Sequence, residues 1–364
     1  LVTPGVSFND QVLDHKRNNY VAAISYQEKD AQYGVAFLDI STGEFMCSQG
    51  PLAYVQKLIQ SFMPAEILYP KKYRSVYQEN FGDQTHSFSL EEWIFSHEFT
   101  YPLLTEHFKT KNLKGFGIEN MPLGIIAAGV ILHYLAETEH KQVGHIATIQ
   151  RIEEDKFVWL DRFTIRNLEL VYSVQEGGVP LISLLDQTLT PMGARLLRKW
   201  MVLPLKELGA IQERQQGVAG LLELPDVLEA LINLLKPIGD LERLISKVAA
   251  GRINPRELVQ LKRALQQIPA IKETLASHPA EILQKWADQL NPCLHLVQKI
   301  ESALRDDAPM LVHQGGIIKT GYLAELDELH LLSTNGKDYL AAMQKREIER
   351  TGITSLKVAY NKVF

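Results

Sequence analysis

The chain has 364 residues, of which 46% are hydrophobic, so it is too long for one ordinary core and too apolar to be disordered. Its 38 Lys and Arg residues against 43 Asp and Glu residues give a net charge of −5, so any attraction to nucleic acid must come from a local patch. We expect no membrane segment, because no run approaches the roughly 18 apolar residues that a membrane helix needs, and no signal peptide, which favours the cytoplasm.

The two cysteines, Cys47 and Cys293, lie far apart in the sequence. Neither has another Cys or a His nearby at ligand spacing, so the sequence indicates neither a disulfide framework nor a zinc site. We expect both to be small buried apolar residues.

The first half of the chain has the pattern of an α/β domain. Apolar runs bounded by turn residues predict strands, and wider apolar spacing predicts helices. The expected elements are strands at Tyr20–Ser25, Gly34–Asp39, Glu44–Cys47 and Glu66–Tyr69, and helices at Leu52–Phe62 and Pro122–Glu139. This order predicts a mixed sheet with helices packed on it.

The second half is predicted to be mainly helical. Beyond Leu160 strand signals nearly vanish, and apolar residues recur at spacings of three and four, as in Met192, Leu196 and Trp200. Prolines divide this half into short helices of an irregular bundle, and no fixed-period repeat indicates a solenoid. The stretch from His140 to Gly144 is polar and is expected to separate the two halves.

A long helix is predicted from Tyr322 to Arg350, with a heptad pattern along it. At 1.5 Å per residue it would be about 43 Å long, so one end should project from the body as an arm. We expect its apolar base, at Leu326 and Leu329, to pack on the core or on a neighbouring chain. The alternative is an ordinary solvated helix end.

Both ends of the chain look cut. It has no initiator Met, and it stops within residues 358–364, which alternate as in a strand but have no hairpin partner. The expectation is an internal fragment of a longer protein.

Several segments, in order, resemble the MutS family. They are Val2–Gly5, Leu38–Phe45, Arg166–Leu170, Leu184–Thr188, Met192–Trp200, Asp240–Leu244, Gly321–Leu329 and Glu349–Phe364. The resemblance covers essentially the whole chain. It implies a ribonuclease H-like α/β connector domain at 1–139, a helical core at 140–320, a lever helix at 321–352 and the first strand of a truncated clamp at 353–364.

The family resemblance also implies a protein that forms a homodimer around double-stranded DNA, reads mispairs with an N-terminal domain and hydrolyses ATP with magnesium in a C-terminal domain. This chain lacks the Gly-x-x-x-x-Gly-Lys-Ser/Thr phosphate loop, since Gly336-Lys337 is followed by Asp338 within a predicted helix. The mispair-reading wedge would precede Leu1. We therefore expect no catalytic residue, no metal ligand, no bound cofactor and no enzyme activity in this chain.

Asp39 is the one carboxylate whose position resembles a nuclease site. It lies near the end of a strand, as does the first catalytic carboxylate of ribonuclease H-like nucleases, but no later acidic residue of the domain follows a convincing strand end. We favour a structural role, in which Asp39 and Thr42 cap a turn. A metal-dependent nuclease is the alternative.

Basic residues gather at the tip of the predicted arm. Between residues 337 and 362 six basic residues face three acidic ones, a local balance of +3 in an acidic chain. Lysine, arginine and asparagine side chains at such a tip can bind DNA phosphates without reading bases. The candidates are Lys357, Asn361, Lys362, Arg346 and Arg350, although Arg350 has Glu347 as an alternative partner.

A second basic group, Arg195, Arg198 and Lys199, lies on one predicted helix. It could contact DNA, but basic residues on a polar helix face are common. Asp240, Glu242 and Arg243 are expected to fasten core helices together.

The leading interpretation is a non-catalytic scaffold that transmits conformation between a mismatch reader and an ATPase, with weak DNA backbone contact at the clamp end. The alternatives are the nuclease and a docking module for a MutL-type repair partner, whose contact residues the sequence does not indicate.

Overall fold

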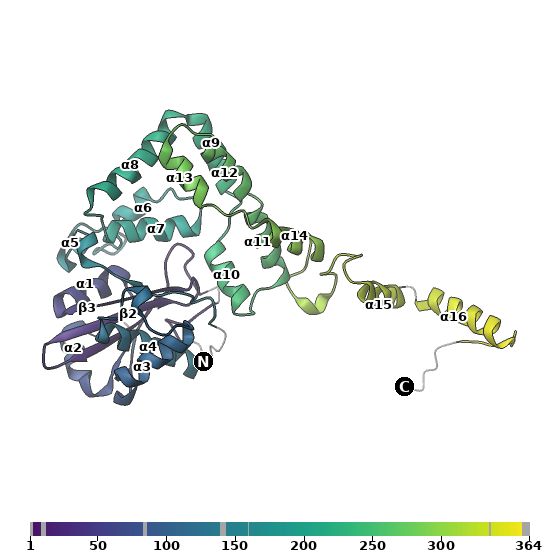
Figure 1. The fold of residues 1–364 in the computed structure, drawn as a ribbon, viewed down its shortest axis with the longest axis horizontal. Coiled ribbons are helices and arrows are strands. Elements are labelled where there is room, and N and C mark those ends of the chain that lie inside the picture. Colours follow the sequence, from purple (N-terminus) through teal and green to yellow (C-terminus); the bar gives the residue numbers. More distant parts are fainter. Residues whose placement is uncertain are drawn as a thin grey trace.

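The computed structural model describes residues 3–8, 12–82, 86–138, 143–158, 160–334 and 336–358. An α/β body lies beside a helical region, and a helical arm projects away from both (Figure 1). Among the described residues, no helix is long and apolar enough to cross a membrane.

The α/β body is built on a mixed sheet, as predicted. In the described residues its strand order is β5-β4-β1-β2-β3-β6, with β1–β2 and β2–β3 antiparallel and the other neighbours parallel. The strands are β1 (Val21–Gln27), β2 (Gln32–Asp39), β3 (Glu44–Pro51), β4 (Glu66–Pro70), β5 (His86–Leu90) and β6 (Gln150–Arg151).

Helices cover both faces of this sheet, which explains why its central strands are apolar at almost every position. Val21 and Leu38 point into one hydrophobic core, whereas Ala22 and Phe37 point into the other. The helices of this half are α1 (Leu52–Phe62), α2 (Arg74–Phe81), α3 (His97–His107) and α4 (Pro122–Glu137), with short 3-10 turns at Lys71–Tyr73, Glu92–Phe95 and Lys114–Phe116. Helix α4, apolar all round, is buried between α3 and the sheet.

The second half of the chain is helical, as predicted. Its helices are α5 (Arg162–Asn167), α6 (Leu181–Leu185), α7 (Pro191–Val202), α8 (Leu208–Glu223), α9 (Pro225–Leu235), α10 (Leu241–Ala249), α11 (Pro255–Leu265), α12 (Ile268–Ala276), α13 (Glu281–Gln289) and α14 (Leu294–Ala303), with 3-10 turns at Glu154–Lys156 and Val312–Gln314. Several of these helices begin with proline. Proline lacks a backbone N–H donor, and this is tolerated in the first turn of a helix, where that donor has no partner within the helix. At α11, Asn254 and Glu257 also form a capping box.

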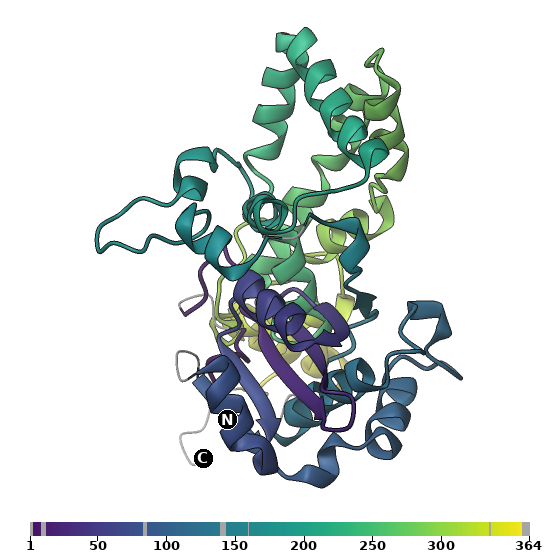
Figure 2. The same ribbon diagram turned by 90° about the vertical axis from the view of Figure 1, so that its left-hand side faces the viewer.

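The two halves share one hydrophobic core. Phe37 and Leu58 of the α/β body are buried in the same cluster as Ile165, Leu170 and Val202 of the helical region. Figure 2 shows the helical region standing directly on the α/β body. The first part of the helical region is therefore packed onto the sheet rather than tethered to it.

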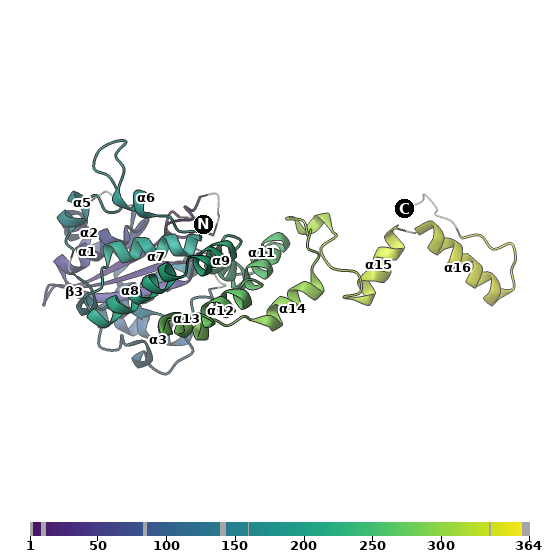
Figure 3. The same cartoon turned by 90° about the horizontal axis from the view of Figure 1, so that it is seen from above.

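The long helix predicted from Tyr322 to Arg350 is described as two helices, α15 (Ala324–Thr334) and α16 (Gly336–Thr351), with Asn335 outside the described residues. Together they project from the body as the expected arm (Figure 3). The prediction that the apolar base packs on the core is wrong within this chain: Leu329 is 61% exposed, and Leu326 is only half-buried. The physical reason is that the arm points away from the elements that could cover it.

The predicted clamp strand is not formed in its described part. After α16, Gly352 adopts a left-handed φ of +73°, and residues 353–358 form turns and coil. The chain folds back along α16, where the Val358 amide donates to the Gln344 side chain at 3.2 Å. Residues 359–364, which hold most of the predicted strand, lie outside the described residues.

Both cysteines are free. Cys47 is fully buried in the sheet, as expected, and burial raises the pKa of its thiol to about 12. Cys293 is only half-buried and begins α14 with a left-handed φ of +50°, so the expectation of a buried apolar residue is wrong there. It lies in the turn before the helix and packs against the edge of the hydrophobic cluster that contains Leu244 and Val297.

Gly34 sets the closest approach of the sheet to α4. A Cβ at this position would lie 2.2 Å from the Leu123 backbone, which cannot move aside as a side chain can. We predict that Gly34→Ala lowers the free energy of unfolding of the α/β domain by about 1–3 kcal/mol, the usual cost of overpacking. Differential scanning calorimetry measures it. Gly209→Ala, where the added methyl meets no atom within 4 Å, is the control, and equal melting temperatures for the two variants would contradict the prediction.

Candidate functional site

The two halves of the chain are fastened by a buried arginine, Arg195 of α7, which is only 4% exposed. Its guanidinium makes two 2.7 Å hydrogen bonds to the Asp240 carboxylate and a 2.5 Å bond to Glu242. It also donates to the backbone carbonyl of His15 at 3.0 Å. One side chain therefore joins α7, the start of α10 and the N-terminal segment.

Arg243 makes a second set of hydrogen bonds to the N-terminal segment that Arg195 contacts. Its guanidinium donates to the backbone carbonyls of Asp14 and Arg17, at 3.0 and 2.8 Å. Asp240 caps α10 by accepting from the Arg243 amide, so the acceptor of Arg195 is itself fixed. The prediction that Asp240, Glu242 and Arg243 fasten core helices is confirmed, and the contact with the N-terminal segment is new.

The carboxylate of Glu44, at the start of β3, accepts the hydrogen bonds of a third contact at the junction. Lys199 of α7 donates to it at 2.5 Å, and the Tyr20 hydroxyl donates at 2.6 Å. Burial, together with the charge of Glu44, raises the pKa of Tyr20 well above its usual value, so this hydroxyl stays a donor. The sheet and the helical region are thus joined by charge as well as by apolar packing.

These contacts decide the role of the basic group on α7. Arg195 and Lys199 are bound to carboxylates and face the junction, and Arg198 donates to the Val171 carbonyl at 3.3 Å. These contacts give no support to the alternative that this group forms a nucleic-acid patch, because Arg195 and Lys199 are occupied by carboxylates.

Asp39 is a saturated structural carboxylate. It is fully buried and accepts from the Asn18 side chain, the Asn19 amide and both the amide and hydroxyl of Ser41, at 2.6–3.1 Å. Its carbonyl accepts from the Thr42 amide, which closes the predicted turn. In the described part of the chain no group of three or more His, Cys, Asp or Glu residues is arranged to hold a metal. The turn-capping interpretation is confirmed, and this geometry gives the nuclease alternative no support.

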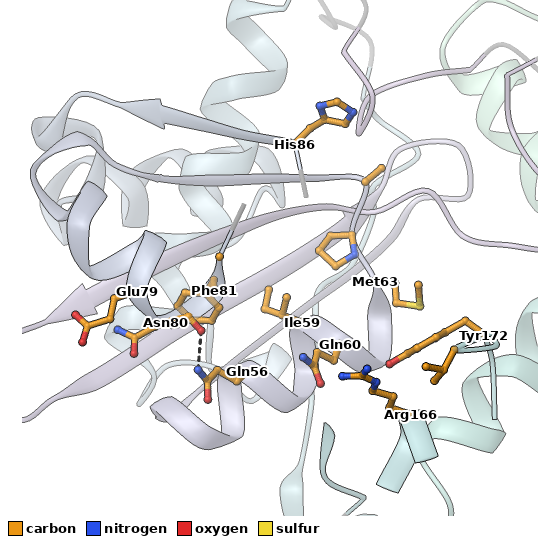
Figure 4. A pocket seen from close by; sticks show the side chains of 14 residues that line it. Gln56, Ile59, Gln60, Met63, Glu79, Asn80, Phe81, His86, Arg166 and Tyr172 are labelled. Carbon is orange, nitrogen blue, oxygen red and sulfur yellow. Dashed lines mark hydrogen bonds between the residues drawn. The ribbon is translucent and has the colours of Figure 1, made fainter. Parts of the chain in front are cut away.

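The junction also has an open part, a cavity of about 820 Å³ between the ends of α1 and α2 and the segment around Tyr172 (Figure 4). The Gln56 side chain bridges the two helices by donating to the Asn80 carbonyl at 2.7 Å, and Arg166 and Tyr172 face it from the helical region. The cavity adjoins residues 83–85, which lie outside the described residues, so we assign it no ligand. The firm contacts between the halves are therefore those of α1 with α5 and α7.

The predicted DNA-binding residues lie on the arm. Arg346 and Lys357 are exposed, and Arg350 is also exposed but donates to Glu347 at 2.8 Å. Arg346 and Arg350 are four residues apart on α16 and so share a helix face. Asn361 and Lys362 lie outside the described residues. The arm thus presents cations to solvent, in contrast to the junction, where they are paired.

The α/β domain is packed firmly onto a helical region, and that region ends in a projecting arm. This architecture is that of a multidomain protein whose domains can move one another. The family model for MutS domain II matches residues 19–147, and that for MutS domain III matches residues 163–358. The chain belongs to the MutS family.

Curated relatives agree with this assignment. The chain is 59% identical over 364 residues to the DNA mismatch repair protein MutS of Cytophaga hutchinsonii. It is 50% identical to the protein of that name from Bacteroides fragilis and 48% identical to that from Flavobacterium johnsoniae, over the same length. In each case the match covers 100% of this chain and 42% of the relative.

The junction network predicts a large effect of Arg195→Leu. The change would remove both hydrogen bonds from Arg195 to the largely buried Asp240 and leave it with the more distant Arg243 guanidinium, at 3.7 Å. Breaking a buried ion pair from one side costs about 3–5 kcal/mol. Chemical denaturation followed by circular dichroism measures it. The control is Lys285→Gln, which breaks an ion pair with Glu213 whose side chains are 59% and 40% exposed, and should cost about 0–1 kcal/mol. Similar costs for the two changes would contradict the role given to Arg195.

Proposed function

We propose that this chain acts in DNA mismatch repair as a non-catalytic connector, core and lever, which transmits conformation between a mismatch reader and an ATPase. The observation that supports the proposal is the junction. The shared apolar core and the Lys199–Glu44 pair tie the sheet to the helical region, from which the arm projects, and Arg195 ties the N-terminal segment to that region through the His15 carbonyl. The relatives' name, DNA mismatch repair protein MutS, gives the process.

A tightly packed junction suits this role because packed interfaces shift between discrete arrangements instead of deforming continuously. A displacement of the α/β domain would then move α7 and α10 with it. We infer that the whole protein binds ATP and magnesium outside this chain, dimerises, and works in the cytoplasm. The chain matches 42% of its relatives' length, which leaves room for those parts.

DNA contact is proposed for the arm. Exposed Arg346 and Lys357, with Arg350 after release from Glu347, can bind phosphates of double-stranded DNA, and Asn361 and Lys362 are proposed to extend this surface. Such contacts add affinity without base recognition. The binding should therefore be weak, salt-dependent and indifferent to mispairs.

We predict that removing two of these cations, in Arg346→Gln with Lys357→Gln, weakens duplex binding and flattens its salt dependence. The slope of log K against log salt should fall by about 0.9 for each phosphate that the variant no longer neutralises. Fluorescence anisotropy of a labelled duplex, titrated with salt, measures the slope.

The matched control removes two exposed cations elsewhere, in Lys71→Gln with Lys285→Gln, and should leave the slope unchanged. A duplex with one mispair is measured beside the perfect duplex. A clear mispair preference by this chain alone would refute the proposal of sequence-independent contact.

A second role, docking of a MutL-type repair partner, is favoured by exposed aromatic residues on the α/β domain. Phe88 of edge strand β5 is 52% exposed, and Trp93 is 59% exposed. Their rings lie against Tyr134 and His133, neighbours on α4, at centroid distances of 6.2 and 5.7 Å. Exposed aromatic side chains on a rigid support are typical of protein contacts.

We predict that Phe88→Ser with Trp93→Ser reduces capture of a purified MutL-type protein by this chain at least about tenfold, as expected when two aromatic anchors are removed. A pull-down with purified components measures capture. The control, Phe163→Ser, removes an aromatic residue that is 66% exposed in the helical region. Unchanged capture by the double variant would exclude this surface.

A further inference from the structure

A small cavity lies inside the junction, between the end of α1 and the outer turns of α7. Its volume is about 110 Å³, several times the roughly 30 Å³ of one water molecule. Residues from both halves line it, among them Tyr20, Ser61 and Phe62 of the α/β domain and Val171, Arg198 and Val202 of the helical region. A ligand held there would touch both halves at once.

The charged residues that line this cavity all have the same sign. Four basic residues line it (Arg17, Arg195, Arg198 and Lys199), and none of the described residues that line it is acidic. Three of these cations have carboxylate partners outside the lining: Arg17 with Asp14, Arg195 with Asp240 and Lys199 with Glu44. Because these carboxylates neutralise three of the cations, Arg198 is the lining cation that is left without a counter-charge among the described residues.

Arg198 differs from the other three. In the described part of the chain it has no ion-pair partner, and its guanidinium donates only to the Val171 carbonyl, at 3.3 Å. Its burial and the neighbouring Arg17 lower its pKa, and the more distant Asp14 and Asp186 only partly oppose this. Arg198 is half-buried, and a cation partly removed from water without a counter-charge is costly, so an anion in the cavity would lower that cost.

Two buried donors at the cavity also have no partner. Ser61 is only 8% exposed, and its hydroxyl has no hydrogen-bond partner among the described residues, nor has the Nε of Arg195. Buried polar groups are nearly always satisfied, so each unsatisfied one needs an explanation. A ligand that accepts hydrogen bonds explains both.

We propose that this cavity binds a small tetrahedral oxyanion of the phosphate class, which Arg198 and the Ser61 hydroxyl hold between α1 and α7. Guanidinium groups bind such oxyanions through two parallel N–H donors, and a serine hydroxyl can donate a further bond. The apolar walls formed by Phe62, Val171 and Val202 exclude water from these contacts and strengthen them.

The consequence is a ligand-controlled junction. Since the site is complete only when α7 lies against α1, bound oxyanion stabilises that arrangement according to its concentration relative to its dissociation constant. The inference goes beyond the proposed function and does not depend on it, because it concerns how firmly the two halves are held in any activity.

The test is titration of the 364-residue chain with inorganic phosphate at constant ionic strength, with sodium chloride as the balancing salt. Phosphate should raise the melting temperature progressively, and the ³¹P resonance should broaden on binding. Arg198→Gln should weaken binding at least about tenfold, which corresponds to about 1.4 kcal/mol, and Ser61→Ala should weaken it less. Lys71→Gln, which removes an exposed cation of the α/β domain, should change nothing.

An equal rise in melting temperature with chloride, or unchanged phosphate binding by Arg198→Gln, would overturn the proposal. Far-UV circular dichroism establishes that each variant is folded. Should Arg198→Gln fail to fold, Ser61→Ala, which removes a single side-chain oxygen, and Arg198→Lys, which keeps the charge but removes the fork, carry the same test. Adenosine monophosphate in place of phosphate distinguishes the sources: competition that needs Arg198 assigns a nucleotide phosphate, and its absence assigns the free ion.

Discussion

Burial of the Arg195 guanidinium between Asp240, Glu242 and the His15 carbonyl is the contact that holds α7, the start of α10 and the N-terminal segment together. Exposed ion pairs contribute little, because water screens them and side-chain entropy opposes them. A buried pair differs in that removing one partner leaves a charge that water cannot reach. The cost of separating the halves is thus concentrated at α7, where apolar packing and charge act together.

The contacts at the junction join particular pairs of elements. The Lys199–Glu44 contact ties α7 to the sheet, where Tyr20 also holds Glu44, and the Arg195 and Arg243 contacts tie the N-terminal segment to α7 and α10. An open cavity lies at the other end of the interface, beside α2. Under the proposal made above, an oxyanion bound beside Arg198 would strengthen the contact between α1 and α7.

The basic residues of this chain have two different roles, and the role of each depends on whether it is buried or exposed. At the junction Arg195 and Lys199 are paired with carboxylates and hold the fold, whereas on the arm Arg346 and Lys357 remain exposed and available to a polyanion. The net charge of −5 hides this division. The exposed apolar side chains of the arm, such as Leu329, show that α15 has an apolar face that the described chain does not cover.

The sequence by itself determined the order of strands and helices, because periods of two and of three to four residues record which faces are buried. It also determined the turn at Asp39, where local residues supply the donors, and the family, through ordered motifs. Only the tertiary structure decided the roles of Arg195, Arg198 and Lys199, since their partners lie 27 to 180 residues away in the chain. It also decided that the heptad base stays exposed, because a heptad pattern states that a helix has an apolar face but not what covers it.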